Sequence, residues 1–303
     1  MSRGVDSLST LVAGLDGTIE PFTHLVWIDG ISPFVSRPTA RRLWRDTRSL
    51  GDDVGIPAVR IATNLQDETE RCIRWGRAVG AVTIGAALSL GGRYGSLVFS
   101  PTLESGRADP NGSHPEIDPG WSTSRTAVPY TDPYGRRIER LRAVIRLPDL
   151  VRHLHVCWEV DSASNCGRCN KCLQTGTGMV ALGASDVAAT VFGRVPDPEA
   201  IRALPPFSSV LVHDLIDACA ERAPQLGEAW SDHARSSNPA GQWGAGGFDL
   251  RRRRRPYTTA LAAAVPLGWG ATSTPVHLQG NTVVPAAPAL DRPLRWSMLG
   301  PRT

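Results

Sequence analysis

The sequence predicts an α/β protein in which a parallel sheet carries helices on both faces, joined to a four-cysteine knuckle. Three observations predict this fold class. Short apolar runs alternate with helical patterns over residues 24–100, a loop of small residues precedes the first helical pattern, and four cysteines are clustered within 157–172. Short strands that alternate with helices form parallel sheets, and such sheets bind ligands at the carboxyl ends of their strands.

The net charge and the distribution of apolar residues indicate which partners and which cellular compartment to expect. The 303 residues carry a formal net charge of +4, which is small for this length and does not predict a general affinity for nucleic acid. The sequence has no apolar run long enough to cross a bilayer, and its first residues contain no apolar signal region. We therefore expect a cytoplasmic protein with reduced thiols and no membrane partner.

The first motif is the segment Ser2–Ser7, followed at once by a helical pattern through Leu15. Backbone N–H groups at the start of a helix, together with the helix dipole, favour phosphate. Ser2 and Ser7 offer hydroxyl groups to phosphate oxygens, and Asp6 could cap the helix or bind a magnesium ion. The segment therefore indicates an anion site, with a helix cap at a frayed terminus as the alternative.

The next elements are expected in alternating order. Strands are predicted at 24–29, 57–62 and 94–100, and helices at 37–50, 68–90 and 135–145. Residues 104–133 form a polar loop whose length is typical of lids and binding loops, and within it 113–118 could contact substrate or lie in solvent. The arginines of the last of these helices are interpreted as a solvated face rather than a phosphate site; they are Arg136, Arg137, Arg140 and Arg142.

The cysteine motif begins within a predicted strand at 153–158, which contains its first cysteine. Its members are Cys157, Cys166, Cys169 and Cys172, in the spacing C-x8-C-x2-C-x2-C. Two residues between thiols let one tight turn present both sulfurs to a single ion, so a tetrahedral site is expected, and zinc is its commonest occupant. An iron–sulfur cluster, a disulfide pair or scattered structural thiols are the alternatives. Cys72 and Cys219 are interpreted as buried small hydrophobic residues.

The domain organisation is predicted in three parts. Residues 1–185 form the α/β domain that contains the anion site, with the knuckle at 157–172, and residues 186–235 form a helical extension with helices at 197–204 and 210–222. From residue 236 to 303 the composition shifts to Gly, Pro, Ala and Arg without periodicity, which predicts a disordered tail. Any affinity for RNA is expected in its arginine run at 251–255.

Together the two motifs resemble the PP-loop ATP pyrophosphatases. Ser2–Ser7 is similar to the S-G-G-x-D-S loop of that superfamily, and the cysteine spacing is similar to the zinc site of its 7-cyano-7-deazaguanine synthase branch in queuosine biosynthesis. The resemblance spans residues 2 to about 182 and implies an adenine nucleotide alpha hydrolase-like fold. It implies ATP binding by Ser2, Gly4, Val5, Asp6 and Ser7, a structural Zn²⁺ on the four cysteines, and adenine near strand 24–29. Arg3 departs from the family pattern, which usually has glycine there.

The resemblance also implies an activity. A PP-loop enzyme of this branch adenylates a carboxylate or carbonyl oxygen of a small molecule, using ATP with Mg²⁺, and releases pyrophosphate. A nitrogen nucleophile such as ammonia then displaces AMP. The alternatives are sulfur transfer to tRNA and a non-catalytic zinc-binding homologue. No catalytic side chain is assigned, nucleic acid is not an expected partner, and the oligomeric state stays open, with a homodimer as one option.

Overall fold

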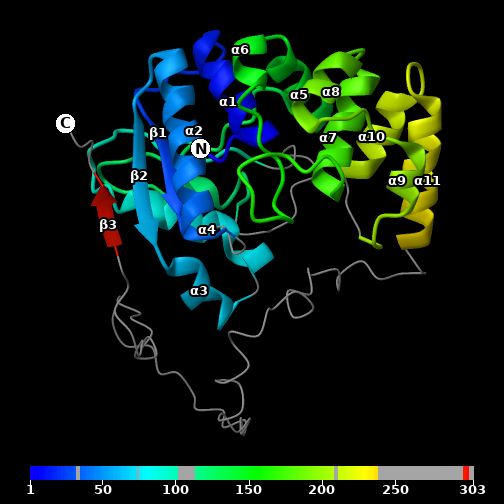
Figure 1. The fold of residues 1–303 in the computed structure, drawn as a ribbon. Helices are drawn as coiled ribbons and strands as arrows, with labels where there is room; N and C mark the ends of the chain where they lie inside the picture. The colour runs from blue at the N-terminus through cyan, green and yellow to red at the C-terminus, as the bar shows by residue number, and fades with distance from the viewer. Residues whose placement is uncertain (32–34, 74, 102–112, 208–210, 238–295, 300–303) are drawn as a thin grey trace, which may run out of the picture. The chain divides into compact units, whose positions relative to one another are not determined.

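The structure is a computed structural model that describes all residues except 32–34, 74, 102–112, 208–210, 238–295 and 300–303 (Figure 1). The N-terminal elements are α1 (Val5–Leu15), β1 (Leu25–Asp29), α2 (Arg37–Val54), β2 (Ala58–Thr63), α3 (Leu65–Glu70) and α4 (Trp75–Leu88). They are followed by the 3-10 helix η2 (Asp118–Trp121), α5 (Arg137–Ile145), α6 (Pro148–Val151), α7 (Asn170–Ala181), α8 (Ser185–Phe192), α9 (Pro198–Arg202), α10 (Leu211–Cys219), α11 (Pro224–Ser237) and β3 (Trp296–Leu299). No helix in these described ranges has the length and apolar character needed to span a membrane.

The sheet is smaller than the sequence predicts. Strands β1 and β2 pair in parallel, from Leu25 opposite Ala58 to Asp29 opposite Ala62, which confirms the first two predicted strands. Strand β3 adds to the other edge of β2 in the antiparallel direction, although its residues fall in the predicted disordered tail. The structure is therefore mixed α/β with a parallel pair of strands, and the larger parallel sheet is not found among the described residues.

Two predicted strands are wrong, and their backbone hydrogen bonds explain why. Residues 94–100 form only isolated bridges, Ser96 with Ala127 and Phe99 with Tyr130, so this segment pairs with the loop that follows it. His153 ends a turn, and residues 154–158 form no strand because their backbone donors are satisfied elsewhere. The side-chain oxygen of Asn165 accepts from the N–H groups of Val156 and Cys157, at 2.9 and 3.3 Å, and so takes the place of a neighbouring strand.

Helix α2 lies against the parallel strands and ends four residues later than predicted. Ser36 caps its first turn, since the Ser36 hydroxyl accepts from the N–H of Thr39 at 3.4 Å, and Gly55 ends it with a φ of 69°. The predicted helix at 68–90 is divided into α3 and α4. A turn in which the carbonyl of Thr69 accepts from the N–H groups of both Cys72 and Ile73 separates the two helices.

The largest apolar core joins α1 to α5 and to the cysteine segment. Val5, Leu8 and Leu11 of α1 are buried with Leu141 of α5 and with three of the four cysteines. Figure 1 shows α1 beside α5, which in turn packs on α7. This core holds the start of the chain against a segment about 150 residues away in sequence, so it positions the candidate site.

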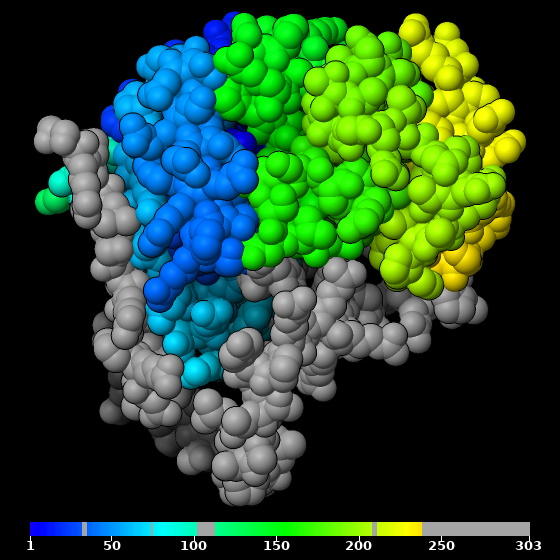
Figure 2. Space-filling view, in the orientation of Figure 1, coloured from blue at the N-terminus to red at the C-terminus, as the bar shows by residue number. Residues whose placement is uncertain are grey.

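A second apolar core lies among the C-terminal helices. Helices α10 and α11 pack on α9 and α7 rather than on the sheet, and the buried Trp230 donates its indole N–H to the hydroxyl of Thr177 at 3.1 Å. Neither α8 nor α11 was among the individually predicted helices, and α11 extends through Ser237, two residues into the predicted tail. Apart from β3, the rest of that tail, including 251–255, lies outside the described residues. In Figure 2 the green middle of the chain lies between the blue surface of α2 and the yellow-green C-terminal helices.

His233 gives this second core a pH dependence. Its imidazole is buried against Phe207 and Trp230, and burial lowers the pKa of His233 below its ordinary value. A histidine with a lowered folded pKa binds fewer protons when folded, so stability is lost as the pH falls below about 6.5. We expect His233→Phe to flatten the decline in the free energy of unfolding as the pH falls below about 6.5.

The test is urea unfolding at several pH values, with His213→Phe as the control. His213 lies on the neighbouring helix α10 and is exposed, so its replacement removes an imidazole without removing a buried one. An equal flattening in both variants would show that burial of His233 is not the cause.

Candidate metal centre and phosphate loop

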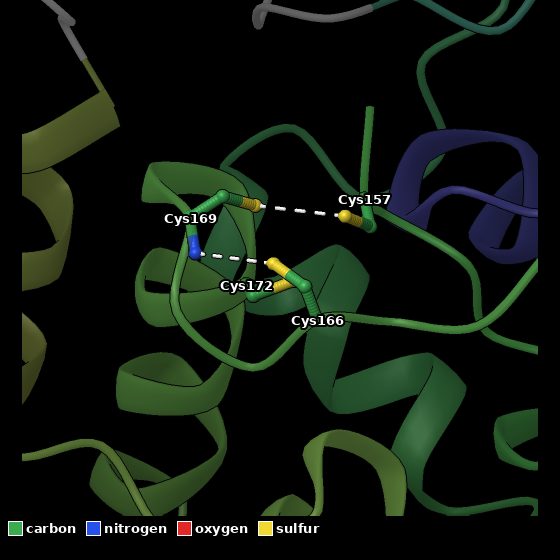
Figure 3. Close-up of side chains that lie close together, drawn as sticks. All are labelled: Cys157, Cys166, Cys169 and Cys172. Atoms are coloured by element: carbon green, nitrogen blue, oxygen red, sulfur yellow. Dashed lines mark hydrogen bonds between the residues drawn. The ribbon is translucent and has the colours of Figure 1, made fainter. Parts of the chain in front are cut away.

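The four cysteines of the motif come together in one cluster. Their sulfur atoms all lie within 4.8 Å of one another, and three of the four side chains are buried (Figure 3). Cys157 comes from the segment 154–158, and Cys166 from the tight turn. Cys169 is the N-cap residue of α7, and Cys172 lies in the first turn of that helix. Among the described residues this is the only such group of metal-ligand side chains.

The sulfur spacing fits a metal better than a disulfide. Cys157 and Cys169 have sulfurs 3.9 Å apart, as do Cys166 and Cys172. A regular tetrahedron with metal–sulfur distances of about 2.3 Å has edges of about 3.8 Å, whereas a disulfide bond is about 2.05 Å long. All four are free cysteines, so the arrangement is compatible with a structural metal site.

The local backbone is shaped for this cluster. Gly167 has a φ of 67°, and a Cβ there would lie 2.3 Å from the carbonyl oxygen of Phe192, so only glycine fits. The turn also directs the N–H of Cys169 toward the sulfur of Cys166 at 3.3 Å, which stabilises negative charge on that sulfur. Gly178, lower in α7, lets this helix approach α5, because a Cβ there would meet the Leu141 side chain at 2.7 Å.

Without a bound metal, the thiols of this cluster differ in pKa. The pKa of Cys157 is held well below its usual range, chiefly by the hydrogen bond from Cys169 and then by that from Cys172. Its hydrogen bond to Cys157 raises the pKa of Cys169 to about 12. Metal ligation replaces these protons, so metal affinity falls with falling pH.

The predicted phosphate loop is the turn that leads into α1. The Ser2 and Ser7 hydroxyls lie 3.1 Å apart, and the Ser2 hydroxyl accepts from the N–H of Gly4 at 3.3 Å. Gly4 is the N-cap of α1, without a side chain that could cap the helix, so the helix starts with free N–H groups beside two hydroxyls. Such a start is suited to an anion.

Arg3 has an unusual backbone and a buried side chain. It is the only non-glycine residue among those described with a positive φ, 63°. A left-handed backbone at a residue with a Cβ costs about 1–2 kcal/mol. The side chain leaves the loop and forms an ion pair with Asp46 of α2 at 3.2 Å, so it does not cover the hydroxyls of Ser2 and Ser7.

Asp6 is held by two arginines of α5. Arg137 lies 3.0 Å from both carboxylate oxygens of Asp6, and Arg140 lies 3.1 Å from one of them. Arg140 is only 2 % exposed and also donates to Asp132 at 2.8 Å and to the carbonyl of Pro101. The interpretation of these two arginines as a solvated face is therefore wrong, whereas Arg142 is exposed and pairs with Glu139.

Lys171 adds a third cation beside the loop. It lies between two of the cysteines in sequence, and its ammonium is 4.4 Å from the centre of the Trp158 ring. Burial, and then the charge of Arg137, lower the pKa of Lys171 to about 8, against the opposing effect of the Asp6 charge. Lys171 is the only lysine of the chain, but no pattern in the sequence predicted a functional role for it.

A direct contact joins the phosphate loop to the cysteine segment. The N–H of His155 donates to the carbonyl of Arg3 at 2.9 Å, two residues before Cys157. The guanidinium of Arg3 also lies 3.4 Å from the carbonyl of His153. The two motifs recognised separately in the sequence are thus parts of one packed unit.

Other candidate residues lie outside this unit. In the loop 113–118, the buried Asp118 accepts from the Ser113 hydroxyl at 2.7 Å and from the His114 N–H at 3.1 Å, so its carboxylate orders the loop itself. Cys72 is exposed, contrary to expectation, and Cys219 is buried as predicted. Beside strand β1, the Arg60 guanidinium lies over the Trp27 ring at 5.5 Å and pairs with Asp29.

Comparison with known proteins gives no assignment. No protein-family model, no curated protein and no solved structure matches this chain.

Proposed function

We propose that the chain binds ATP with Mg²⁺ at Ser2, Gly4, Val5, Asp6 and Ser7 and adenylates a carboxylate or carbonyl oxygen of a small molecule. In that step the oxygen attacks the α-phosphorus, the bond to the β,γ-pyrophosphate breaks, and pyrophosphate leaves. A nitrogen nucleophile, such as ammonia, then displaces AMP. The reaction resembles that of 7-cyano-7-deazaguanine synthase.

The observation that carries this proposal is the contact between the loop and the cysteine knuckle. Either motif alone occurs in many proteins, whereas the hydrogen bond from His155 to Arg3 and the shared core of Val5, Cys157 and Cys172 make them one structure. That combination is the one on which the resemblance to the PP-loop synthase branch depends. The left-handed backbone at Arg3, at the family's glycine position, supports the same loop conformation.

The electrostatics beside the loop support an anionic ligand. Three cations, Arg137, Arg140 and Lys171, meet two carboxylates, Asp6 and Asp132, so the group retains excess positive charge. Excess positive charge beside hydroxyls and free helix N–H groups stabilises developing charge on a leaving pyrophosphate. Zn²⁺ on the four cysteines would be structural, fixing the turn that carries Lys171.

A non-catalytic homologue is the second candidate, and one contact favours it. Both oxygens of Asp6 already face Arg137, so this carboxylate has cationic partners without a magnesium ion. In that case the chain would keep the folded loop and knuckle but would not catalyse a reaction. Measurement of nucleotide binding separates the two candidates.

We expect ATP with Mg²⁺ to raise the melting temperature of the metal-loaded chain. At about 100 times its Kd, a ligand stabilises the folded state by about 2.7 kcal/mol. Asp6→Ala should abolish this rise, and Ser7→Ala should reduce it while leaving the pairs between Asp6 and the arginines in place. Pyrophosphate release with candidate carboxylates then reports turnover.

Two matched variants control this experiment. Asp186 occupies the second position of α8, as Asp6 does in α1, and is exposed. Ser9 lies on α1 but bonds to the carbonyl of Asp6 inside the helix at 2.9 Å. Asp186→Ala and Ser9→Ala should both keep the ATP effect. A rise that persists in Ser7→Ala and Asp6→Ala would refute the phosphate-loop assignment.

A further inference from the structure

Helix α2 buries one face and exposes arginines on the other. Thr39, Leu43 and Leu50 are buried against the sheet, since α2 packs on β1 and β2. The solvent side carries five exposed arginines, which we call the α2 arginine face: Arg37, Arg41, Arg42, Arg45 and Arg48. Part of the surface of α2 is visible in blue on the near side of Figure 2.

These arginines have no partners within the described part of the chain. None of the five guanidinium groups takes part in an ion pair or hydrogen bond there, whereas most of the other exposed arginines on helices do, such as Arg142 with Glu139. The one carboxylate among them in sequence, Asp46, is directed to Arg3. The helix therefore presents uncompensated positive charge.

The spacing of the arginines within the α2 arginine face destabilises the helix. Arg37, Arg41 and Arg45 follow one another at i, i+4, and Arg45 and Arg48 stand at i, i+3, so like charges lie side by side. Each like-charge pair destabilises a helix by about 0.2–0.5 kcal/mol. Arg37 also places positive charge in the first turn, where the helix dipole disfavours it. A helix face that only contacts water would be more stable if it carried charges of both signs.

The geometry selects a linear polyanion. From Arg37 to Arg48 the helix rises about 16 Å, a length that covers about five phosphates of one nucleic-acid strand at 3.4 Å each. The planar guanidinium fork also matches phosphate oxygens in pairs. Negative charge bounds this surface, with Asp161 at the helix start, where it accepts from the N–H of Ser36, and Asp52 near its end.

A membrane surface fits less well. Amphipathic helices bind bilayers by inserting an apolar face, and the apolar face of α2 is already buried against β1 and β2. From these observations we propose that the α2 arginine face binds the phosphate backbone of a nucleic acid. This binding is independent of the nucleotide site, and the small net charge of the whole chain conceals it because carboxylates elsewhere in the sequence offset the arginines of this helix.

The test compares two full-length, metal-loaded variants by fluorescence anisotropy with labelled single-stranded RNA and DNA. The helix variant changes Arg37, Arg41, Arg45 and Arg48 to Gln, a residue of similar helix propensity. The control variant changes Arg77, Arg93, Arg125 and Arg222, exposed arginines elsewhere, to Gln and loses the same charge. Far-UV circular dichroism and metal content confirm that both are folded, and Arg41→Gln/Arg45→Gln replaces the helix variant if the four changes together prevent folding. A separate variant with Lys at the four helix positions keeps the charge and serves as a second control.

We expect the helix variant to bind at least about tenfold more weakly at low salt and to flatten the slope of log K against log salt by about 2–3. The control should retain the wild-type slope, and the Lys variant should bind within a few-fold of wild type. Equal losses in helix and control variants would overturn the proposal. The proposal would also be overturned if the wild-type chain showed no measurable affinity for RNA or DNA, or if the helix variant bound as the wild type does. It would be overturned as well if binding to anionic vesicles or to an acidic peptide depended on these arginines to the same extent as binding to nucleic acid.

Discussion

Cys169→Ser should lose the bound metal and most of the stability of the fold. The Cys169 sulfur is buried in the cluster, and its neighbours pack in the largest apolar core with Val5 and Leu8. Binding of a structural zinc ion is worth about 10–16 kcal/mol in small domains, which exceeds the stability of most proteins, about 5–15 kcal/mol. We therefore expect a poorly soluble chain with a broad or absent thermal transition and a substoichiometric metal content by elemental analysis.

The control is Cys72→Ser, the same chemical change at an exposed cysteine outside the cluster. It should keep about one metal per chain and the wild-type melting temperature. The spectrum of the metal-loaded protein separates zinc from an iron–sulfur cluster, because zinc gives no visible absorption. If Cys169→Ser kept both metal and stability, the four cysteines would not form a metal site.

Arg140→Met should have the second largest effect. Arg140 is 2 % exposed and joins Asp6, Asp132 and the carbonyl of Pro101. Its loss leaves the Asp132 carboxylate, itself largely buried, without its closest cation. Removal of one partner of a buried ion pair costs about 3–5 kcal/mol, and urea unfolding with an unchanged m-value would measure this loss.

Arg142→Gln is the matched control for that measurement. Arg142 lies two residues further along α5, is exposed, and pairs with Glu139 at 2.9 Å. An exposed pair of this kind contributes about 0.3–0.5 kcal/mol. Equal and small losses in both variants would mean that Arg140 is not the link between α5 and the loop.

Local patterns in the sequence identified most of the individual elements. The apolar runs that become β1 and β2 are buried on the sheet, and the spacing of the cysteines gave the cluster because two intervening residues fix a turn. The predicted strand at 153–158 had the same apolar signal. It was wrong because Asn165, a polar side chain eight residues after Cys157, satisfies its backbone donors, and no periodicity encodes such a contact.

The pairing of Asp6 with Arg137 and Arg140 was missed for a related reason. Arginine is usually exposed, so four arginines on one helix indicated a solvated face. Arg140, however, sits beside Leu141 and Val144 on the buried side of α5, and this interruption of an apolar stripe was the available signal. Its partner, Asp6, is 134 residues away, a separation that sequence patterns do not bridge.

The most direct test of the account is a calorimetric titration of ATP with Mg²⁺ into the metal-loaded chain. The loop and the knuckle form one packed unit, and three cations flank it. The account predicts saturable binding near one nucleotide per chain, weakened in Ser2→Ala/Ser7→Ala and unchanged in Ser9→Ala. Absence of binding heat in the folded, metal-loaded protein, or equal affinity in all three proteins, would contradict it.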